Sequence, residues 1–220
     1  EMGVSGYSIE NVSQVQDKNG EWRPIDSDKD PTVILLHYPS ILEDTINYIP
    51  PRVKIEISCL SMDEPTELRP IRSLIGESFD GEDTDAESLV RTVVPSRTFL
   101  EKLFLLAEEF QKEKPRSVRM SRHLYDLEKL MDTEYGKEAL SNRELYDAIV
   151  EHRKAYYALK YVNYDLHTPS TINFTIPESA MEAWQDDYAD MRRFFIYGES
   201  LEFDELMQKM RELQERVRIM

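Results

Sequence analysis

The chain divides into two parts by the spacing of its apolar residues. In the first 95 residues, short runs rich in β-branched and apolar side chains lie between turn residues, a pattern typical of strands. Three such runs are predicted to be strands: 32–38, which Pro39 ends, 52–59 and 89–94. Residues 1–30 are polar and include an Asn-Gly turn signal within 18–22, so we expect a hairpin or an irregular segment there.

After Pro95 the apolar period changes from two residues to about 3.6, which is typical of amphipathic helices. Five helices are predicted: 96–112, 121–131, 141–160, 177–197 and 203–218. Strands followed by helices predict an α+β fold rather than an alternating one. We expect a β-containing domain over 1–95 and a helical domain over 96–220.

Two helix starts carry sequence signals for N-terminal caps. Ser96 or Thr98 is expected to cap the first helix, and Thr98 has Glu101 three residues later, the spacing of a capping box. SNRE at 141–144 has a similar pattern and is expected to open the third helix.

Residues 76–87, GESFDGEDTDAE, form a predicted acidic loop before the last strand. Asp80, Asp83 and Asp85 offer carboxylates to a calcium ion, but their spacing does not match the loop of an EF-hand. The spacing favours an ordinary solvated loop.

Composition excludes several classes of protein. The net charge of −16 argues against indiscriminate nucleic-acid binding, which needs clustered Lys and Arg, but leaves room for a local basic pocket. The chain has no apolar run long enough to span a membrane and no recognisable signal peptide, so we expect no membrane partner. The single cysteine, Cys59, forms no disulfide within the chain and fits a cytoplasmic protein.

The stretch VKIEIS, within the second predicted strand, places different chemistry on its two faces. Lys54 and Glu56 share one face, because side chains alternate along a strand, and Val53, Ile55 and Ile57 share the other. We expect the apolar face to be buried. The polar face has two interpretations: a solvated ion pair, or a carboxylate that holds a metal with a lysine beside it for phosphate.

Lys102 lies inside TFLEKLFLL, an apolar run of the first predicted helix. It either turns toward the interior or extends its ammonium to water along its aliphatic stem.

In the second predicted helix, Asp126 lies about one turn after Arg122 and His123, so either residue is a candidate partner in an ordinary ion pair. No zinc, P-loop, dinucleotide or serine-hydrolase motif accompanies these residues.

Four blocks of the chain resemble one known family. VKIEIS, RTFLEKL and SRHLYDL, followed by the late WQDDYADMRRFFIYGESLEFDELMQKM, are similar to the AbiEii/AbiGii toxins of the DNA polymerase beta-type nucleotidyltransferase superfamily. The similarity covers roughly residues 32–216, and RTFLEKL and SRHLYDL in this order are its most specific part. The resemblance implies part of a nucleotidyltransferase-type sheet followed by an all-helical bundle.

The resemblance also implies a reaction and three catalytic residues. A nucleoside triphosphate would give its nucleotidyl group to an acceptor, while Mg²⁺ and lysines stabilise the charge on the transferring phosphate. Glu56 matches a carboxylate of the family that binds the metal. Lys102 matches the helix lysine that faces the triphosphate, and Asp126 matches the acidic residue that orients a lysine or the nucleotide.

Three further residues are implied to bind nucleotide: Lys54 beside the strand carboxylate, and Arg122 and His123 in the SRHLYDL block. The family setting implies a type IV toxin–antitoxin system, abortive infection and phage defence. The implied partners are a nucleoside triphosphate, an RNA or protein acceptor, with RNA favoured, and a cognate antitoxin in the cytoplasm.

One part of the family pattern is absent. The family has a Gly-Ser turn and a DxD pair of metal-binding carboxylates before the strand of Glu56, and this sequence has neither there. Because the first residue is not Met, we expect the chain to be the C-terminal portion of a longer protein. It would be inactive by itself, since one carboxylate cannot set up two metal sites. The alternative is a non-catalytic protein-interaction domain with a degenerate nucleotidyltransferase site.

Overall fold

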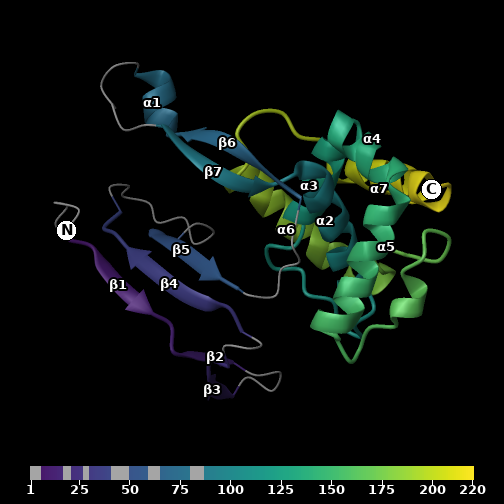
Figure 1. Ribbon diagram of the computed structural model, residues 1–220, viewed down its shortest axis with the longest axis horizontal. Coiled ribbons are helices and arrows are strands. Elements are labelled where there is room, and N and C mark those ends of the chain that lie inside the picture. Colours follow the sequence, from purple (N-terminus) through teal and green to yellow (C-terminus); the bar gives the residue numbers. More distant parts are fainter. Residues whose placement is uncertain (1–5, 17–20, 27–29, 41–49, 59–64, 80–86) are drawn as a thin grey trace. The chain divides into compact units, whose positions relative to one another are not determined.

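The fold contains two compact units, each made of two stretches of chain (Figure 1). The computed structural model describes these residues: 6–16, 21–26, 30–40, 50–58, 65–79 and 87–220. The first unit comprises 1–62 and 190–200, and the second comprises 63–189 and 201–220. Small antiparallel sheets and several helices make the chain an α+β protein, as predicted.

The first unit contains a three-stranded antiparallel sheet and a small hairpin. In the sheet, β4 (Thr32–His37) lies between β1 (Ser8–Asn11) and β5 (Arg52–Ile57), so the predicted strands over 32–38 and 52–59 are confirmed. The hairpin pairs β2 (Gln14–Gln16) with β3 (Trp22–Pro24), which agrees with the hairpin expected near the start of the chain. The Asn-Gly turn itself lies outside the described residues.

The prediction for the apolar face of β5 is wrong. Val53, Ile55 and Ile57 are 49%, 46% and 56% exposed rather than buried. The buried residues of this sheet are Val33 and Leu35 on β4. Alternation along a strand shows which residues share a face, but it does not show which face the rest of the chain covers.

The second unit begins with an antiparallel hairpin of β6 (Thr66–Arg72) and β7 (Glu87–Val93). β7 confirms the short strand predicted over 89–94, whereas the sequence pattern did not predict β6. Between them the short helix α1 (Leu74–Ser78) occupies the start of the predicted acidic loop, and the calcium-loop candidates Asp80, Asp83 and Asp85 lie outside the described residues. The guanidinium of Arg69 donates a hydrogen bond of 2.9 Å to the Tyr135 hydroxyl, which ties this hairpin to the helices.

Helices form the rest of the second unit, and most of them match the predicted periodicity. They are α2 (Pro95–Glu109), α3 (Arg122–Met131), α4 (Glu134–Ser141), α5 (Arg143–His152), α6 (Met181–Phe194), whose last residues belong to the first unit, and α7 (Phe203–Arg218). α2 packs against α3, α4 and α5, and α3 also packs against α7. The division into two compact units does not test whether residues 1–95 and 96–220 fold as separate domains. The predicted domain division therefore stays a prediction.

The predicted helix over 141–160 is wrong in detail. Ser141 ends α4, which was not predicted, and α5 is followed by a π-helical turn, Arg153–Tyr157. Ala158 ends this turn with a left-handed φ of 44°. The turn carries Arg153, whose guanidinium is buried against Glu108 on α2, a contact that local periodicity cannot anticipate.

Both predicted caps also differ from the observed ones. Pro95 opens α2 and its N-cap residue, Val94, makes no side-chain cap, while Glu101 pairs with arginines instead of closing a capping box. At α5 the cap is Asn142, whose side chain accepts a hydrogen bond from the amide of Leu145. Proline at the first position needs no cap for its own nitrogen, because it has no N–H.

The core of the second unit lies around α2. Its fully buried apolar residues are Phe99, Leu100, Leu103, Phe104 and Leu106. α3 adds Leu124 and Leu127, and α6 adds Trp184 and Tyr188.

Candidate functional site

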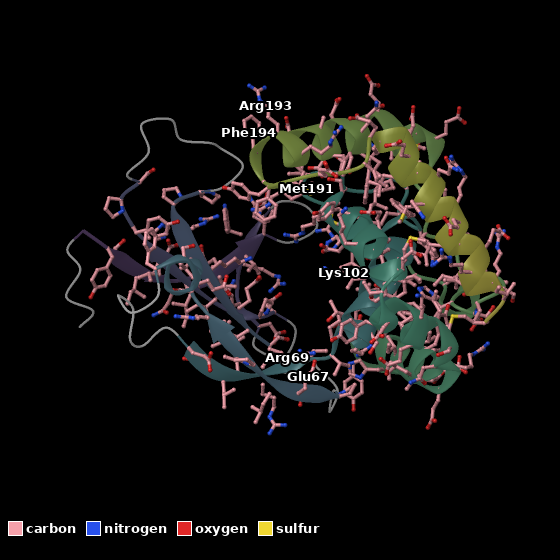
Figure 2. All side chains as sticks on the ribbon, turned by 90° about the horizontal axis from the view of Figure 1, so that it is seen from above. Glu67, Arg69, Lys102, Met191, Arg193 and Phe194 are labelled. Atoms are coloured by element: carbon pink, nitrogen blue, oxygen red, sulfur yellow. The ribbon has the colours of Figure 1, made fainter. Side chains whose placement is uncertain are left out.

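Lys102 and Asp126 meet at the edge of the interface between α2 and α3. The Lys102 ammonium lies 2.6 Å from a carboxylate oxygen of Asp126 (Figure 2 shows Lys102). The side chains are 22% and 36% exposed, because each residue lies beside the buried apolar stripe of its helix. The expected partners of Asp126 were Arg122 or His123 on its own helix, and the ion pair to Lys102 corrects that prediction.

His123 is buried beside this ion pair. Its side chain is 8% exposed, and its Nδ1 atom has no hydrogen-bond partner among the described residues. The pKa of His123 is lowered to about 4, chiefly by burial and then by the positive charges of Lys102 and Arg122, while Asp126 opposes them. The imidazole is therefore neutral at pH 7, while Arg122 is exposed to solvent.

The start of α3 is fixed by a carboxylate from α6. Asp187 accepts hydrogen bonds from the amides of Arg119 and Ser121, at 2.5 and 3.0 Å, and from the Ser121 hydroxyl at 2.5 Å. Arg119 has a left-handed φ of 59°, which turns the chain into the helix. Sequence reasoning missed Asp187, because this partner lies 66 residues away along the chain.

Lys54 and Glu56 form a separate ion pair on β5, in the first unit. Their charged atoms lie 2.8 Å apart, and the two side chains are 49% and 51% exposed. This geometry agrees with the solvated ion pair that the sequence offered as one interpretation. The structure thus pairs four of the predicted site residues, Lys54 with Glu56 and Lys102 with Asp126. The catalytic roles implied for Glu56, Lys102 and Asp126 stay predictions.

The described residues do not by themselves form a magnesium site. Mg²⁺ in nucleotide enzymes is usually held by one or two carboxylates together with substrate phosphates. Among these residues no group of three or more His, Cys, Asp or Glu is arranged to hold a metal ion. Glu56 stands alone as the predicted metal ligand and is already paired with Lys54. We therefore assign no chemical step to a metal.

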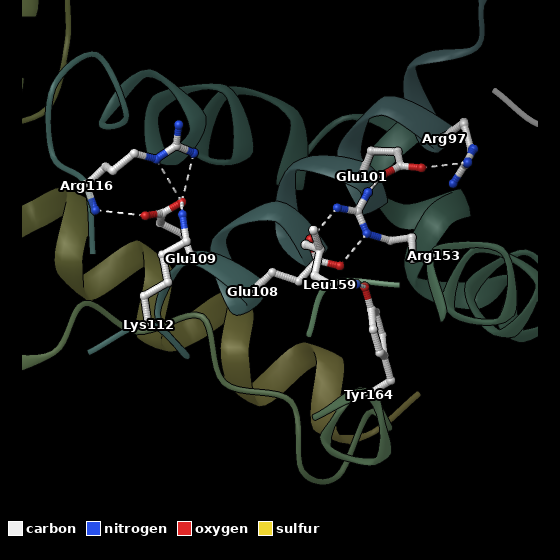
Figure 3. Close-up of polar contacts among 9 residues, drawn as sticks. All are labelled: Arg97, Glu101, Glu108, Glu109, Lys112, Arg116, Arg153, Leu159 and Tyr164. Carbon is white, nitrogen blue, oxygen red and sulfur yellow. Dashed lines mark hydrogen bonds and ion pairs between the residues drawn. The ribbon is translucent and has the colours of Figure 1, made fainter. Parts of the chain in front are cut away.

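A buried charge network stiffens the same helix that carries Lys102 (Figure 3). The Arg153 guanidinium donates two hydrogen bonds to the Glu108 carboxylate, of 2.7 and 2.5 Å, and also pairs with Glu101. Arg97 pairs with the other oxygen of Glu101 at 2.6 Å. These side chains link α2 to the π-helical turn, and both arginines and Glu108 are almost fully buried.

The comparisons with known proteins agree with the resemblance seen in the sequence. A family model described as "Nucleotidyl transferase AbiEii toxin, Type IV TA system" matches residues 7–209. This span contains all of the predicted site residues. Comparison with curated proteins and with solved structures gives no match. Among the described residues, no helix is both long and apolar enough to cross a membrane.

Proposed function

The chain belongs to the AbiEii family of nucleotidyl transferase toxins of type IV toxin–antitoxin systems, and from this premise we propose that it takes part in nucleotidyl transfer from a nucleoside triphosphate to RNA. The reaction would be Mg²⁺-dependent and would take place in the cytoplasm. It would serve abortive infection as a phage defence, with a cognate antitoxin limiting it.

The ion pair between Lys102 and Asp126 carries this proposal. The ammonium stands at the surface edge of two packed helices, where a triphosphate can reach it, and the carboxylate holds it in position. A positive charge held in this way stabilises the charge that develops on a transferring phosphoryl group. The neutral His123 and the exposed Arg122 flank the pair, so four of the implied residues lie close together in the second unit, which supports the proposal.

The reaction balances without a further reactant. A hydroxyl oxygen of the acceptor forms a bond to the α-phosphorus of the triphosphate. The bond from the α-phosphorus to the bridging oxygen breaks, pyrophosphate leaves with the electron pair, and the hydroxyl proton passes to solvent. Lys102 acts here on the charge of the phosphates, and Asp126 acts through Lys102.

Nucleotide binding by a Lys102→Ala variant tests the proposal. A hydrogen bond to a charged group contributes about 1.5–3 kcal/mol, so we expect the affinity for a fluorescent ATP or GTP analogue to fall roughly 10- to 100-fold. Lys209→Ala is the matched control, because Lys209 also forms a surface ion pair, to Asp132 and Glu212. Equal nucleotide affinity of wild type and Lys102→Ala would overturn the role of Lys102.

The non-catalytic alternative also has an observation in its favour. Glu56 is half exposed and paired with Lys54, and within the described part of the chain it belongs to no group of carboxylates arranged to hold a metal ion. Transfer of label from α-labelled nucleoside triphosphate to RNA by the protein expressed from its complete gene, with and without Mg²⁺, separates the two functions. Mg²⁺-dependent labelling that Glu56→Gln abolishes supports the enzyme, whereas nucleotide binding without any labelling supports a degenerate site.

A further inference from the structure

A basic segment stands out in this acidic protein. Residues 112–122, KEKPRSVRMSR, contain five cations and one acid, although the net charge of the chain is −16. We call this segment the basic loop. It connects α2 to α3 and so leads directly into the helix that carries Asp126.

Two carboxylates, those of Glu109 and Asp187, bind the basic loop near its two ends. Glu109, on α2, is 3% exposed and accepts hydrogen bonds of 2.8 Å each from the Arg116 amide, the Arg116 guanidinium and the Lys112 ammonium (Figure 3). At the other end Asp187 binds the backbone of residues 119–121. These contacts engage both carboxylates with the loop and give the loop a defined conformation.

The outer side of the basic loop presents its cations to solvent. Lys114 and Arg119 are exposed, and the Arg116 side chain is 66% exposed even while it binds its carboxylate. Val118 is the exposed large apolar residue within this segment. This composition suits a polyanion better than a lipid surface, which would call for several apolar side chains.

An aromatic ring lies beside these cations. Tyr161 is 45% exposed, and the Lys112 ammonium lies 5.2 Å from the centre of its ring. Arg116 interacts electrostatically with the Tyr161 hydroxyl, so the ring borders the basic loop. Cations that follow a phosphate backbone, together with an exposed ring on which a base can stack, are typical of single-strand binding surfaces.

The basic loop is also close to the candidate nucleotide site. Arg116, Arg122 and Lys102 all act on the imidazole of His123 through their charges, which places the three cations around one residue of α3. Positive charge thus extends from the loop to the ion pair between Lys102 and Asp126, all within the second unit.

We propose that the basic loop and Tyr161 form a binding surface for a single-stranded polynucleotide, with phosphates on Lys114, Arg116 and Arg119 and a base on the ring. That this strand is the acceptor of the nucleotidyl group rests on the proposed function. The surface itself does not, because Lys114, Arg116, Arg119 and Tyr161 are not among the residues implied to bind the nucleotide or a metal.

Fluorescence anisotropy with a labelled single strand of about 12 nucleotides tests the surface, in the absence of nucleoside triphosphate and Mg²⁺. The test variant is Lys114→Gln/Arg119→Asn, which leaves the Glu109 contacts intact and places at 119 a residue that tolerates positive φ. We expect about tenfold weaker binding at low salt. The slope of log Kd against log salt should fall by about 1.4, since each lost phosphate contact removes about 0.7.

A matched variant and a ring variant complete the experiment. Lys137→Gln/Arg211→Asn removes the same charge from exposed positions on α4 and α7, and we expect binding within about twofold of wild type. Tyr161→Phe should keep the affinity and Tyr161→Ala should lower it, because only the ring is needed for stacking. RNA and DNA strands of one sequence, measured in parallel, identify which polynucleotide is preferred.

Three results would overturn the proposal. They are unchanged affinity and salt slope in Lys114→Gln/Arg119→Asn, an equal loss in Lys137→Gln/Arg211→Asn, and tighter binding of duplex than of single strands. Since the assay contains neither nucleoside triphosphate nor Mg²⁺, its outcome is independent of whether nucleotidyl transfer is observed.

Discussion

Glu109 offers the most direct test of how the basic loop is held. Replacing it by Gln keeps the shape of the side chain but removes the negative charge that binds Arg116 and Lys112. The residue is 3% exposed, so water cannot take the place of the lost interactions. We therefore expect Glu109→Gln to destabilise the protein and to loosen the segment that it anchors.

The size of this effect follows from the contacts. A hydrogen bond to a charged group contributes about 1.5–3 kcal/mol to stability, and Glu109 accepts several. Arg116 is 66% exposed and is solvated when released, and glutamine retains an acceptor for the amide. Together these considerations give a loss of about 2–3 kcal/mol in the free energy of unfolding at pH 7, or roughly 4–12 °C in Tm.

The pH dependence of the effect has a defined sign. Burial by itself would raise the pKa of Glu109, but hydrogen bonds from Arg116 and Lys112 more than offset it, so the pKa lies below its usual 4.5. A carboxyl group with a lowered pKa contributes stability that is complete above the unfolded value and disappears as the pH falls through the folded value. The difference between wild type and Glu109→Gln should therefore be constant near neutral pH and shrink below pH 4.5.

Urea denaturation of both proteins at neutral and acidic pH measures this difference, provided that the m-values agree. Glu113→Gln is the control, because Glu113 lies in the same loop but is exposed, and we expect a change within about 0.5 kcal/mol. A Glu109→Gln loss that is the same at pH 7 and at pH 3 would refute the reasoning, since a protonated carboxyl cannot make these charged contacts.

Two further predictions concern the packing around α2 and α4. Arg153→Met should lower the free energy of unfolding by about 3–5 kcal/mol in urea denaturation, because it leaves the buried Glu108 carboxylate without its guanidinium; a loss below about 1 kcal/mol would contradict this. Gly136→Ala should destabilise by about 1–3 kcal/mol, since a Cβ there would lie 2.3 Å from the Leu130 carbonyl oxygen and 2.8 Å from the Met131 Cα. Helix propensity alone predicts the opposite sign for Gly136→Ala, so a gain in Tm would show that the backbone can move aside.

The helices were predictable where their apolar stripe is long and regular. α7 begins and ends at the predicted residues, and α3 begins and ends within one residue of its prediction. The strand β6 was missed because it contains Pro70 and three charged residues and has no buried face. Local alternation is informative only when one side of a strand is covered.

The candidate site was predictable residue by residue but not as a set of contacts. The family resemblance singled out Lys102 and Asp126, whereas spacing along one helix suggested a different partner for Asp126. Asp187 left no local signal, because its partners Arg119 and Ser121 lie 68 and 66 residues away in sequence. Glu109 has its partners nearby, but only burial reveals that its carboxylate faces inward and holds the loop.

Two ion pairs that involve α2 differ in burial and therefore in their expected contribution to stability. The side chains of Arg153 and Glu108 are 6% and 4% exposed. Removing one of them leaves the other as a buried charge without its partner, which strongly lowers the free energy of unfolding. Lys102 and Asp126 are 22% and 36% exposed, and such pairs contribute about 0–1 kcal/mol. An apolar residue at position 102 would extend the buried stripe of Phe99 and Leu103, so stability alone does not account for an ammonium at that position. Lys102→Ala that unfolds like wild type but binds nucleotide poorly would therefore place the role of this lysine in binding, whereas a parallel loss of both would make the pair structural.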